Sequence, residues 1–143
     1  MKKYLISKIA LFFFVFICFS ACTKDTKSIE IGLAYKMLGD KTWFLEYTQN
    51  TIGTNVTIKN FVGQSTYFID FLKDQTTKDS DGITGTYSVE KNGDQLRILI
   101  TAKTFSGNNS SYSYNVVSLG ENQMVLMYNT NSSSIKYYYS TQK

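Results

Sequence analysis

Beyond Gly39 the chain alternates hydrophobic and polar positions with a period of two, which is typical of half-buried β-strands. In the clearest run, Leu96, Ile98 and Ile100 share one face and Arg97 lies on the other. Clusters of Gly, Asn, Asp and Ser separate the runs, as turns do. This pattern predicts eight strands, over residues 42–49, 56–62, 66–72, 83–90, 95–103, 111–119, 123–129 and 135–141.

The segments between these runs are short. Asn92-Gly93 lies between two of them, and this dipeptide is a strong hairpin signal. Short connections join neighbouring antiparallel strands, and closure into a barrel would remove exposed strand edges. We therefore expect an all-β fold, an antiparallel up-and-down barrel of about eight strands. A β-sandwich has the same local signals and is the alternative.

A helical periodicity precedes the strands. The hydrophobic residues on its stripe are Ile29, Leu33 and Met37, with Ala34 and Leu38 beside them. Ser28 is a favourable N-cap residue and Gly39 is a typical helix end. We expect one short helix from Ser28 that packs on the strands through this stripe.

The first residues have the layout of a secretory signal peptide. A lysine-containing start precedes an apolar run from Ile9 to Phe19, and two small residues then precede Cys22. The run is shorter than the about 20 residues that a membrane span needs. Phe19-Ser20-Ala21-Cys22 resembles the lipobox of bacterial lipoproteins. That resemblance implies cleavage before Cys22 and attachment of acyl chains, palmitate among them, to this residue.

These features divide the chain into three parts. Residues 1–21 form the lipoprotein signal peptide, residues 22–27 the lipidated cysteine with a polar tether, and residues 28–143 the barrel domain. We expect a lipid-anchored protein of the outer membrane in the cell envelope. Whether it faces the periplasm or the cell surface is left open.

Composition narrows the chemistry available to the domain. The chain contains no histidine, and its two cysteines both lie at or before residue 22. This excludes Ser-His-Asp and Cys-His catalysis and all histidine metal sites. Three of its 15 basic residues lie in the leader, so the remainder is close to neutral against 11 acidic residues. We expect no enzyme activity, no metal, no cofactor and no nucleic-acid partner.

Several local motifs resemble the lipocalin-like domain of small secreted bacterial lipoproteins. They are Leu38-Gly39 followed by Trp43, and Asp81-Gly82 followed by Gly85-Thr86-Tyr87. The likeness covers about residues 38–141. It implies a barrel in which Gly39, Trp43, Gly85 and Tyr87 have structural roles, and a small ligand held inside it.

Tyrosine is abundant among the expected strands, with 11 residues in the chain. Tyrosine also suits half-buried strands without any ligand, so a structural role is the alternative. If a cavity exists, period two predicts a ligand-binding wall made of Leu45, Tyr47, Tyr112, Tyr114, Leu126 and Tyr128. The mid-strand charges Glu46, Asp70 and Arg97 either face solvent or form an internal polar cluster.

We expect a monomeric, non-enzymatic lipoprotein that binds a small apolar or amphipathic ligand in its barrel. The alternative is a filled barrel that acts as a surface interaction module. Its loops at residues 106–111 and 129–134 would then contact a partner protein or a glycan.

Overall fold

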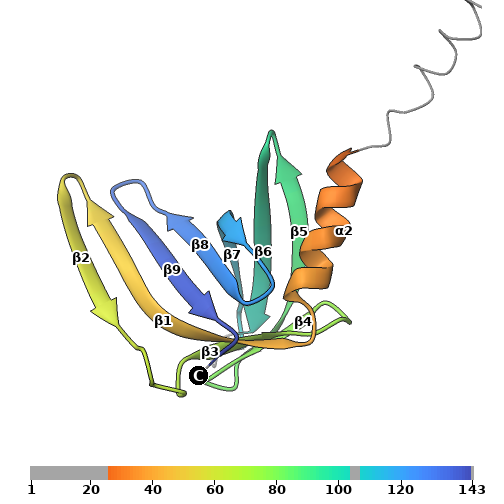
Figure 1. The fold of residues 1–143 in the computed structure, drawn as a ribbon, viewed down its shortest axis with the longest axis horizontal. Coiled ribbons are helices and arrows are strands. Elements are labelled where there is room, and N and C mark those ends of the chain that lie inside the picture. The colour runs from red at the N-terminus through yellow and green to blue at the C-terminus, as the bar shows by residue number, and fades with distance from the viewer. Residues whose placement is uncertain (1–25, 104–106, 143) are drawn as a thin grey trace, which may run out of the picture.

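The computed structural model describes residues 26–103 and 107–142, which form one helix and nine antiparallel strands (Figure 1). The expected signal peptide and the lipid attachment at Cys22 lie outside these residues. The elements are α2 (Thr26–Leu38), β1 (Lys41–Ile52), β2 (Asn55–Asn60), β3 (Phe68–Phe71), β4 (Thr76–Asp79), β5 (Thr84–Asn92), β6 (Gln95–Lys103), β7 (Asn109–Leu119), β8 (Gln123–Asn129) and β9 (Ser134–Ser140).

The sheet closes on itself. Its strand order is β2-β1-β3-β4-β5-β6-β7-β8-β9, and β9 also pairs with β1. Eight strands, β1 and β3 to β9, therefore form a closed antiparallel barrel, and β2 lies outside this ring. The predicted barrel of about eight strands with a short N-terminal helix is confirmed, and the sandwich alternative is wrong.

The strands that form the closed barrel are not all the ones predicted. β3 and β2 follow one another along the same edge of β1, because β3 pairs with Lys41–Phe44 and β2 with Tyr47–Ile52. The ring is completed by β4, which the sequence analysis missed. This strand has no hydrophobic side chain, and its buried residue Thr77 lies opposite Gly85 and Phe71. A strand that contributes one small buried residue has no hydrophobic alternation to detect.

The core lies inside the barrel and against α2. Leu38, Trp43, Phe71, Ile98 and Met124 are fully buried, and burial of each such side chain contributes about 1.5–3 kcal/mol. The indole Nε1 of Trp43 donates a hydrogen bond to the carbonyl oxygen of Leu38 at 3.3 Å. This bond fastens the last turn of the helix to the first strand. We call the barrel face that carries these residues the inner face.

Helix α2 begins at Thr26, so Ser28 lies within it rather than at its N-cap. The stripe that it buries lies to one side of the one expected and includes the two residues placed beside it, Ala34 and Leu38. Ala34 and Leu38 are buried with Ile31 and Tyr35 packed beside them, whereas Leu33 is 49% exposed. The helix is thus rotated about its axis relative to the prediction, and contacts with strand β5 explain this rotation.

β4 pairs with β5 only along Thr84–Thr86, so the following part of the β5 edge has no strand partner. Helix α2 lies against this edge (Figure 1). The hydroxyl of Tyr35 accepts a hydrogen bond from Val89 N–H at 2.9 Å, and Lys91 Nζ pairs with Glu30 at 2.5 Å. The helix is turned so that both side chains reach β5.

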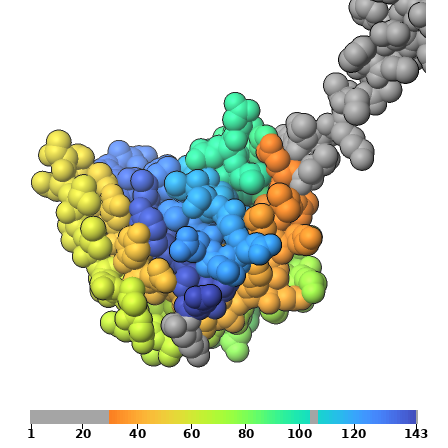
Figure 2. All heavy atoms as spheres, in the orientation of Figure 1, coloured from red at the N-terminus to blue at the C-terminus, as the bar shows by residue number. Residues whose placement is uncertain are grey.

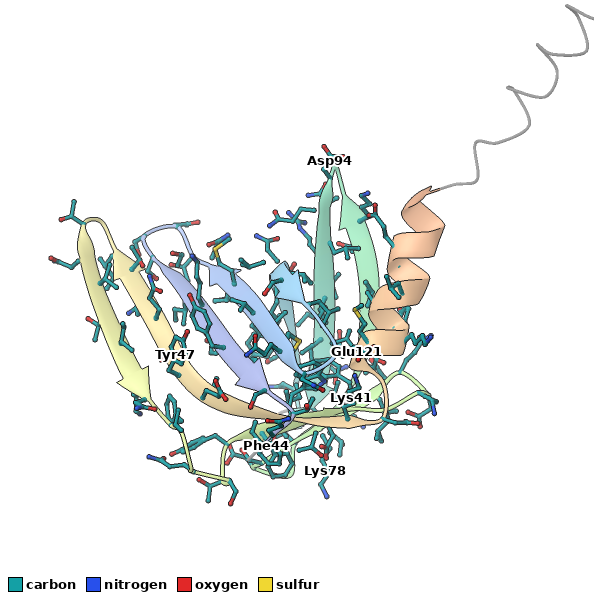
Figure 3. The ribbon with its side chains drawn as sticks, in the orientation of Figure 1. Lys41, Phe44, Tyr47, Lys78, Asp94 and Glu121 are labelled. Atoms are coloured by element: carbon teal, nitrogen blue, oxygen red, sulfur yellow. The ribbon has the colours of Figure 1, made fainter. Side chains whose placement is uncertain are left out.

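The turn between β7 and β8 returns to the start of β1. Lys41 Nζ donates to the carbonyl oxygen of Glu121 at 2.7 Å, and both residues lie together in Figure 3. Within residues 26–103 and 107–142, no helix has the length and hydropathy needed to cross a bilayer.

Candidate ligand-binding site

Five tyrosines from three consecutive strands contact one another inside the barrel. They are Tyr112 and Tyr114 of β7, Tyr128 of β8, and Tyr137 and Tyr139 of β9, and we call them the tyrosine wall. Tyr114 lies at the centre. Its ring centroid is 6.5 Å from that of Tyr112, 5.8 Å from Tyr128 and 5.9 Å from Tyr137.

The strand register explains why these rings share a face. Tyr114 lies directly opposite the buried Ile98, and Tyr137 lies opposite the buried Leu126. Directly opposed residues of antiparallel strands project to the same side of the sheet. Alternation along each strand then carries the neighbouring wall residues two positions away to the inner face as well.

Burial varies along the tyrosine wall. Tyr139 packs against the core, whereas Tyr112 is 40% exposed at the other end. Burial raises the pKa of Tyr114, Tyr137 and Tyr139 above the usual tyrosine value, and neighbouring tyrosines raise each pKa further. The phenols are therefore neutral around pH 7 and can donate hydrogen bonds. The wall therefore runs from Tyr139, beside the core, to the accessible Tyr112.

One polar group on the inner face lacks a partner. Asn50 lies opposite Ile135, which in turn lies opposite Tyr128, so these three residues form a row across β1, β9 and β8. The side-chain oxygen of Asn50 is buried and has no hydrogen-bond partner among the described residues. Buried acceptors are nearly always satisfied in folded proteins. This oxygen can therefore accept a hydrogen bond from an O–H or N–H group that reaches the inner face.

The structure separates the six residues expected to form the ligand-binding wall. Tyr112, Tyr114 and Tyr128 lie in the tyrosine wall, and Leu126 is a core residue that is 2% exposed. Tyr47 does not join them.

A β-bulge at Glu46 moves Tyr47 to the outer face. Leu45 pairs with Tyr139 and Tyr47 pairs with Tyr138, so consecutive residues of β9 oppose residues two apart on β1. The expectation that Leu45 and Tyr47 share a wall is therefore wrong. Tyr47 instead stacks on Tyr138, with ring centroids 4.1 Å apart, and Figure 3 marks its place on β1.

Three residues of this site were missed: Tyr137, Tyr139 and Asn50. The alternation Tyr137-Tyr138-Tyr139 does place the first and third of these on one face. The sequence does not show which face is inside, because all three side chains are tyrosine. Asn50 carries no sequence signal, since its place depends on the strand pairing.

The residues with expected structural roles lie at the base of the barrel. Tyr87 is buried, donates to the carbonyl oxygen of Leu72 at 3.0 Å, and lies edge-on to Phe71 at 4.9 Å. Burial and the neighbouring Tyr35 raise the pKa of Tyr87 to about 12. A Cβ on Gly85 would lie 2.5 Å from the carbonyl oxygen of Thr101, so β5 and β6 approach closely there.

A separate depression lies where β2 leaves β1. The loop between β2 and β3 is fastened at both ends, since Phe61 N–H donates to Glu46 O at 2.6 Å and Leu45 N–H donates to Tyr67 O at 2.9 Å. A cavity of about 200 Å³ beneath it is lined by Leu45, Glu46 and Phe61, among others. The bulge thus places the Glu46 side chain at this cavity.

The mid-strand charges do not form one cluster. Arg97 donates to the Asn115 side chain at 3.2 Å, and Asp70 lies opposite Lys78 on β4. Glu46 lines the small cavity instead. Among the described residues, no group of three or more carboxylate, histidine or cysteine side chains could hold a metal ion.

The fold and the wall together define a small closed β-barrel with an aromatic interior. Among solved structures the chain is similar to a lipocalin-like protein from Bacteroides uniformis, with 16% identity and a TM-score of 0.47 over 74% of this chain and 99% of that one. No family model and no curated protein matches the chain.

Proposed function

We propose that this protein is a non-enzymatic binding protein that holds a small amphipathic ligand against the tyrosine wall. The observation that carries the proposal is the contact of five tyrosine rings on the inner face, with Tyr112 40% exposed at one end. Aromatic rings offer apolar faces and polar tips, which suit a ligand with both characters.

The arrangement favours an amphipathic ligand over a purely apolar one. Ring faces of Tyr114 and Tyr128 supply apolar surface, while the tyrosine hydroxyls donate hydrogen bonds. The unpartnered oxygen of Asn50 accepts one, on the same face. A ligand with an apolar or ring-shaped body and at least one hydroxyl or amide N–H satisfies all of these groups. The mechanism is passive burial in a largely preformed site.

The proposal also places the protein in the cell envelope. The lipobox-like sequence before Cys22 supports attachment to the outer membrane through acyl chains on that residue. Multiple acyl chains give stable anchoring, since each buried methylene contributes about 0.8 kcal/mol. The barrel would then capture its ligand beside the membrane.

Native mass spectrometry tests the proposal. The full chain is expressed with its leader in its parent bacterium, extracted from the envelope in detergent, and analysed with gentle activation. We expect a reproducible added mass that disappears on denaturation. The same mass should be present on Tyr47→Ala, whose side chain lies on the outer face, and should be lost from Tyr112→Ala/Tyr128→Ala.

Thermal unfolding of each variant separates loss of ligand from loss of fold. Asn50→Leu provides a second variant, because it replaces the side-chain amide on the inner face with an apolar group of similar size and should lower occupancy. An added mass retained by the double tyrosine variant would overturn the site. If the parent chain shows only its own mass, the proposal that it holds a ligand is overturned and a surface interaction module is favoured.

A further inference from the structure

The outer edge of β2 carries main-chain groups that none of the described strands covers. β2 is the end of the strand order, and among residues 26–103 and 107–142 it pairs with β1 alone. All six of its residues are exposed, with Val56 at 54% and Ile58 at 64%. The β1–β2 hairpin projects from the body of the barrel (Figure 2), so its edge is sterically accessible.

The register shows which groups face outward. Phe61 N–H donates to Glu46 O, which marks that pair as a hydrogen-bonded pair of the β1–β2 ladder. Hydrogen-bonded and non-hydrogen-bonded pairs alternate along antiparallel strands. The N–H and C=O groups of Thr57 and Lys59 therefore point to β1, and those of Val56 and Ile58 point away from it.

We propose that this edge pairs with the same edge of a second copy of the chain, in an antiparallel register centred on Thr57. In this register Val56 of each copy lies opposite Ile58 of the other. Each such pair exchanges two hydrogen bonds, so the two pairs supply four bonds across the dyad. The two sheets then become continuous through the paired β2 strands.

Complementary side chains favour this register and favour a second copy of the chain as the partner. With Thr57 at the centre, both outward-facing pairs join Val56 to Ile58, and Asn55 lies opposite Lys59 without a like-charge contact. A register centred on Ile58 would place Val56 opposite Asn60 and retain one apolar pair. The strand Asn55–Asn60 is thus complementary to its own sequence, as a two-fold contact requires.

The contact is small, because one strand of six residues forms it. Interfaces well below about 1,000 Å² are weak or transient. A covalent trap is therefore the suitable probe. The two Thr57 residues form a non-hydrogen-bonded pair, whose Cα atoms lie about 4.5 Å apart in such ladders. That separation is within the range of a disulfide.

The experiment uses the full chain in cells, with a mild thiol oxidant and non-reducing electrophoresis. Thr57→Cys should give a disulfide-linked dimer many-fold faster than Ser113→Cys, an exposed strand position of the barrel far from β2 in the strand order. The parent chain reports the background from Cys18 and Cys22. Equal rates for Thr57→Cys and Ser113→Cys would overturn the proposal.

A second substitution tests the main-chain pairing itself. Ile58→Pro removes an N–H that points away from β1, so the β1–β2 ladder keeps its bonds. In the Thr57→Cys background it should slow cross-linking about tenfold, which corresponds to the loss of two intermolecular hydrogen bonds. Ile58→Val keeps the N–H and should cross-link like the Thr57→Cys chain. An unchanged rate with Ile58→Pro would also overturn the proposal.

Discussion

The hydroxyl of Tyr35 accepts a hydrogen bond from the backbone N–H of Val89 at 2.9 Å, across 54 residues of the sequence. The bond joins the middle of α2 to the part of β5 that β4 does not reach. Exposed strand edges are usually covered or shortened in natural sheets. Here a helix residue takes the place of a strand at this edge, which explains why α2 turns Tyr35 rather than Leu33 toward the barrel.

Tyr35→Phe should destabilise the barrel, because it leaves a partly buried backbone donor without an acceptor. The expected loss is about 1–2 kcal/mol in the free energy of unfolding. Chemical denaturation of the purified chain measures it. Tyr67→Phe is the matched control, since the Tyr67 side chain is 43% exposed and its hydroxyl has no hydrogen bond among the described residues. Equal stability of the two variants would show that the Tyr35–Val89 bond contributes nothing.

Alanine substitutions at two glycines should change the stability of the chain in opposite directions. Gly85→Ala would place a Cβ 2.5 Å from the Thr101 carbonyl oxygen and 3.0 Å from Ala102 Cα, both backbone atoms of β6. Forcing these strands apart should cost about 1–3 kcal/mol. Gly32 lies within α2 and a Cβ there meets nothing within 4 Å.

Gly32→Ala should therefore stabilise the chain by up to about 1 kcal/mol through helix propensity. Thermal melting of the two variants beside the parent chain gives both signs in one experiment. A melting temperature for Gly85→Ala at or above that of the parent would contradict the close approach of β5 and β6.

The fold was predictable where one face of a strand carries regular hydrophobic residues. The bounds of Gln95–Lys103 and Gln123–Asn129 are as predicted, since Ile98, Ile100, Met124 and Leu126 are buried at alternating positions. Thr76–Asp79 was not predictable in this way, because its place depends on hydrogen bonds and one buried threonine. A strand that is held mainly by main-chain hydrogen bonds has no hydrophobic alternation by which the sequence could reveal it.

The candidate site was predictable only in part. Strand periodicity correctly grouped Tyr112 with Tyr114, because β7 is regular between them. It failed for Leu45 and Tyr47, where Glu46 forms a bulge that changes the register by one residue. A bulge reverses the face of every following residue, and nothing in Leu45-Glu46-Tyr47 marks it. The inner position of Asn50 follows from that same bulge.

The ion pair between Glu30 and Lys91 should respond unequally to removal of its partners. The Lys91 side chain is 13% exposed, whereas that of Glu30 is 47% exposed. Glu30→Gln leaves the ammonium group of a mostly buried side chain without its carboxylate and should cost about 1 kcal/mol. Lys91→Met removes the charge while keeping the apolar stem, so the loss should be smaller. Urea denaturation compares the two, and a larger loss for Lys91→Met would contradict this account.

Stability should fall at alkaline pH, because a buried tyrosine such as Tyr87 loses its proton at a higher pH in the folded chain than in the unfolded chain. The pKa of Tyr87 is raised from 10.0 to about 12, first by burial and then by the negative charge that Tyr35 and nearby carboxylates bear when ionised. An unfolded chain loses the Tyr87 proton near pH 10 while the folded chain keeps it. The stabilising contribution of the neutral phenol is therefore complete below about pH 10 and is lost as the pH rises toward 12.

Melting temperatures measured at steps between neutral pH and pH 12 test this linkage. The parent chain should fall steeply above pH 10, and Tyr87→Phe should fall less steeply because one linked proton is absent. Lysine titration affects both proteins equally and so cancels in the comparison. Parallel curves for the parent and Tyr87→Phe would show that Tyr87 ionises no later in the folded barrel than in the unfolded chain.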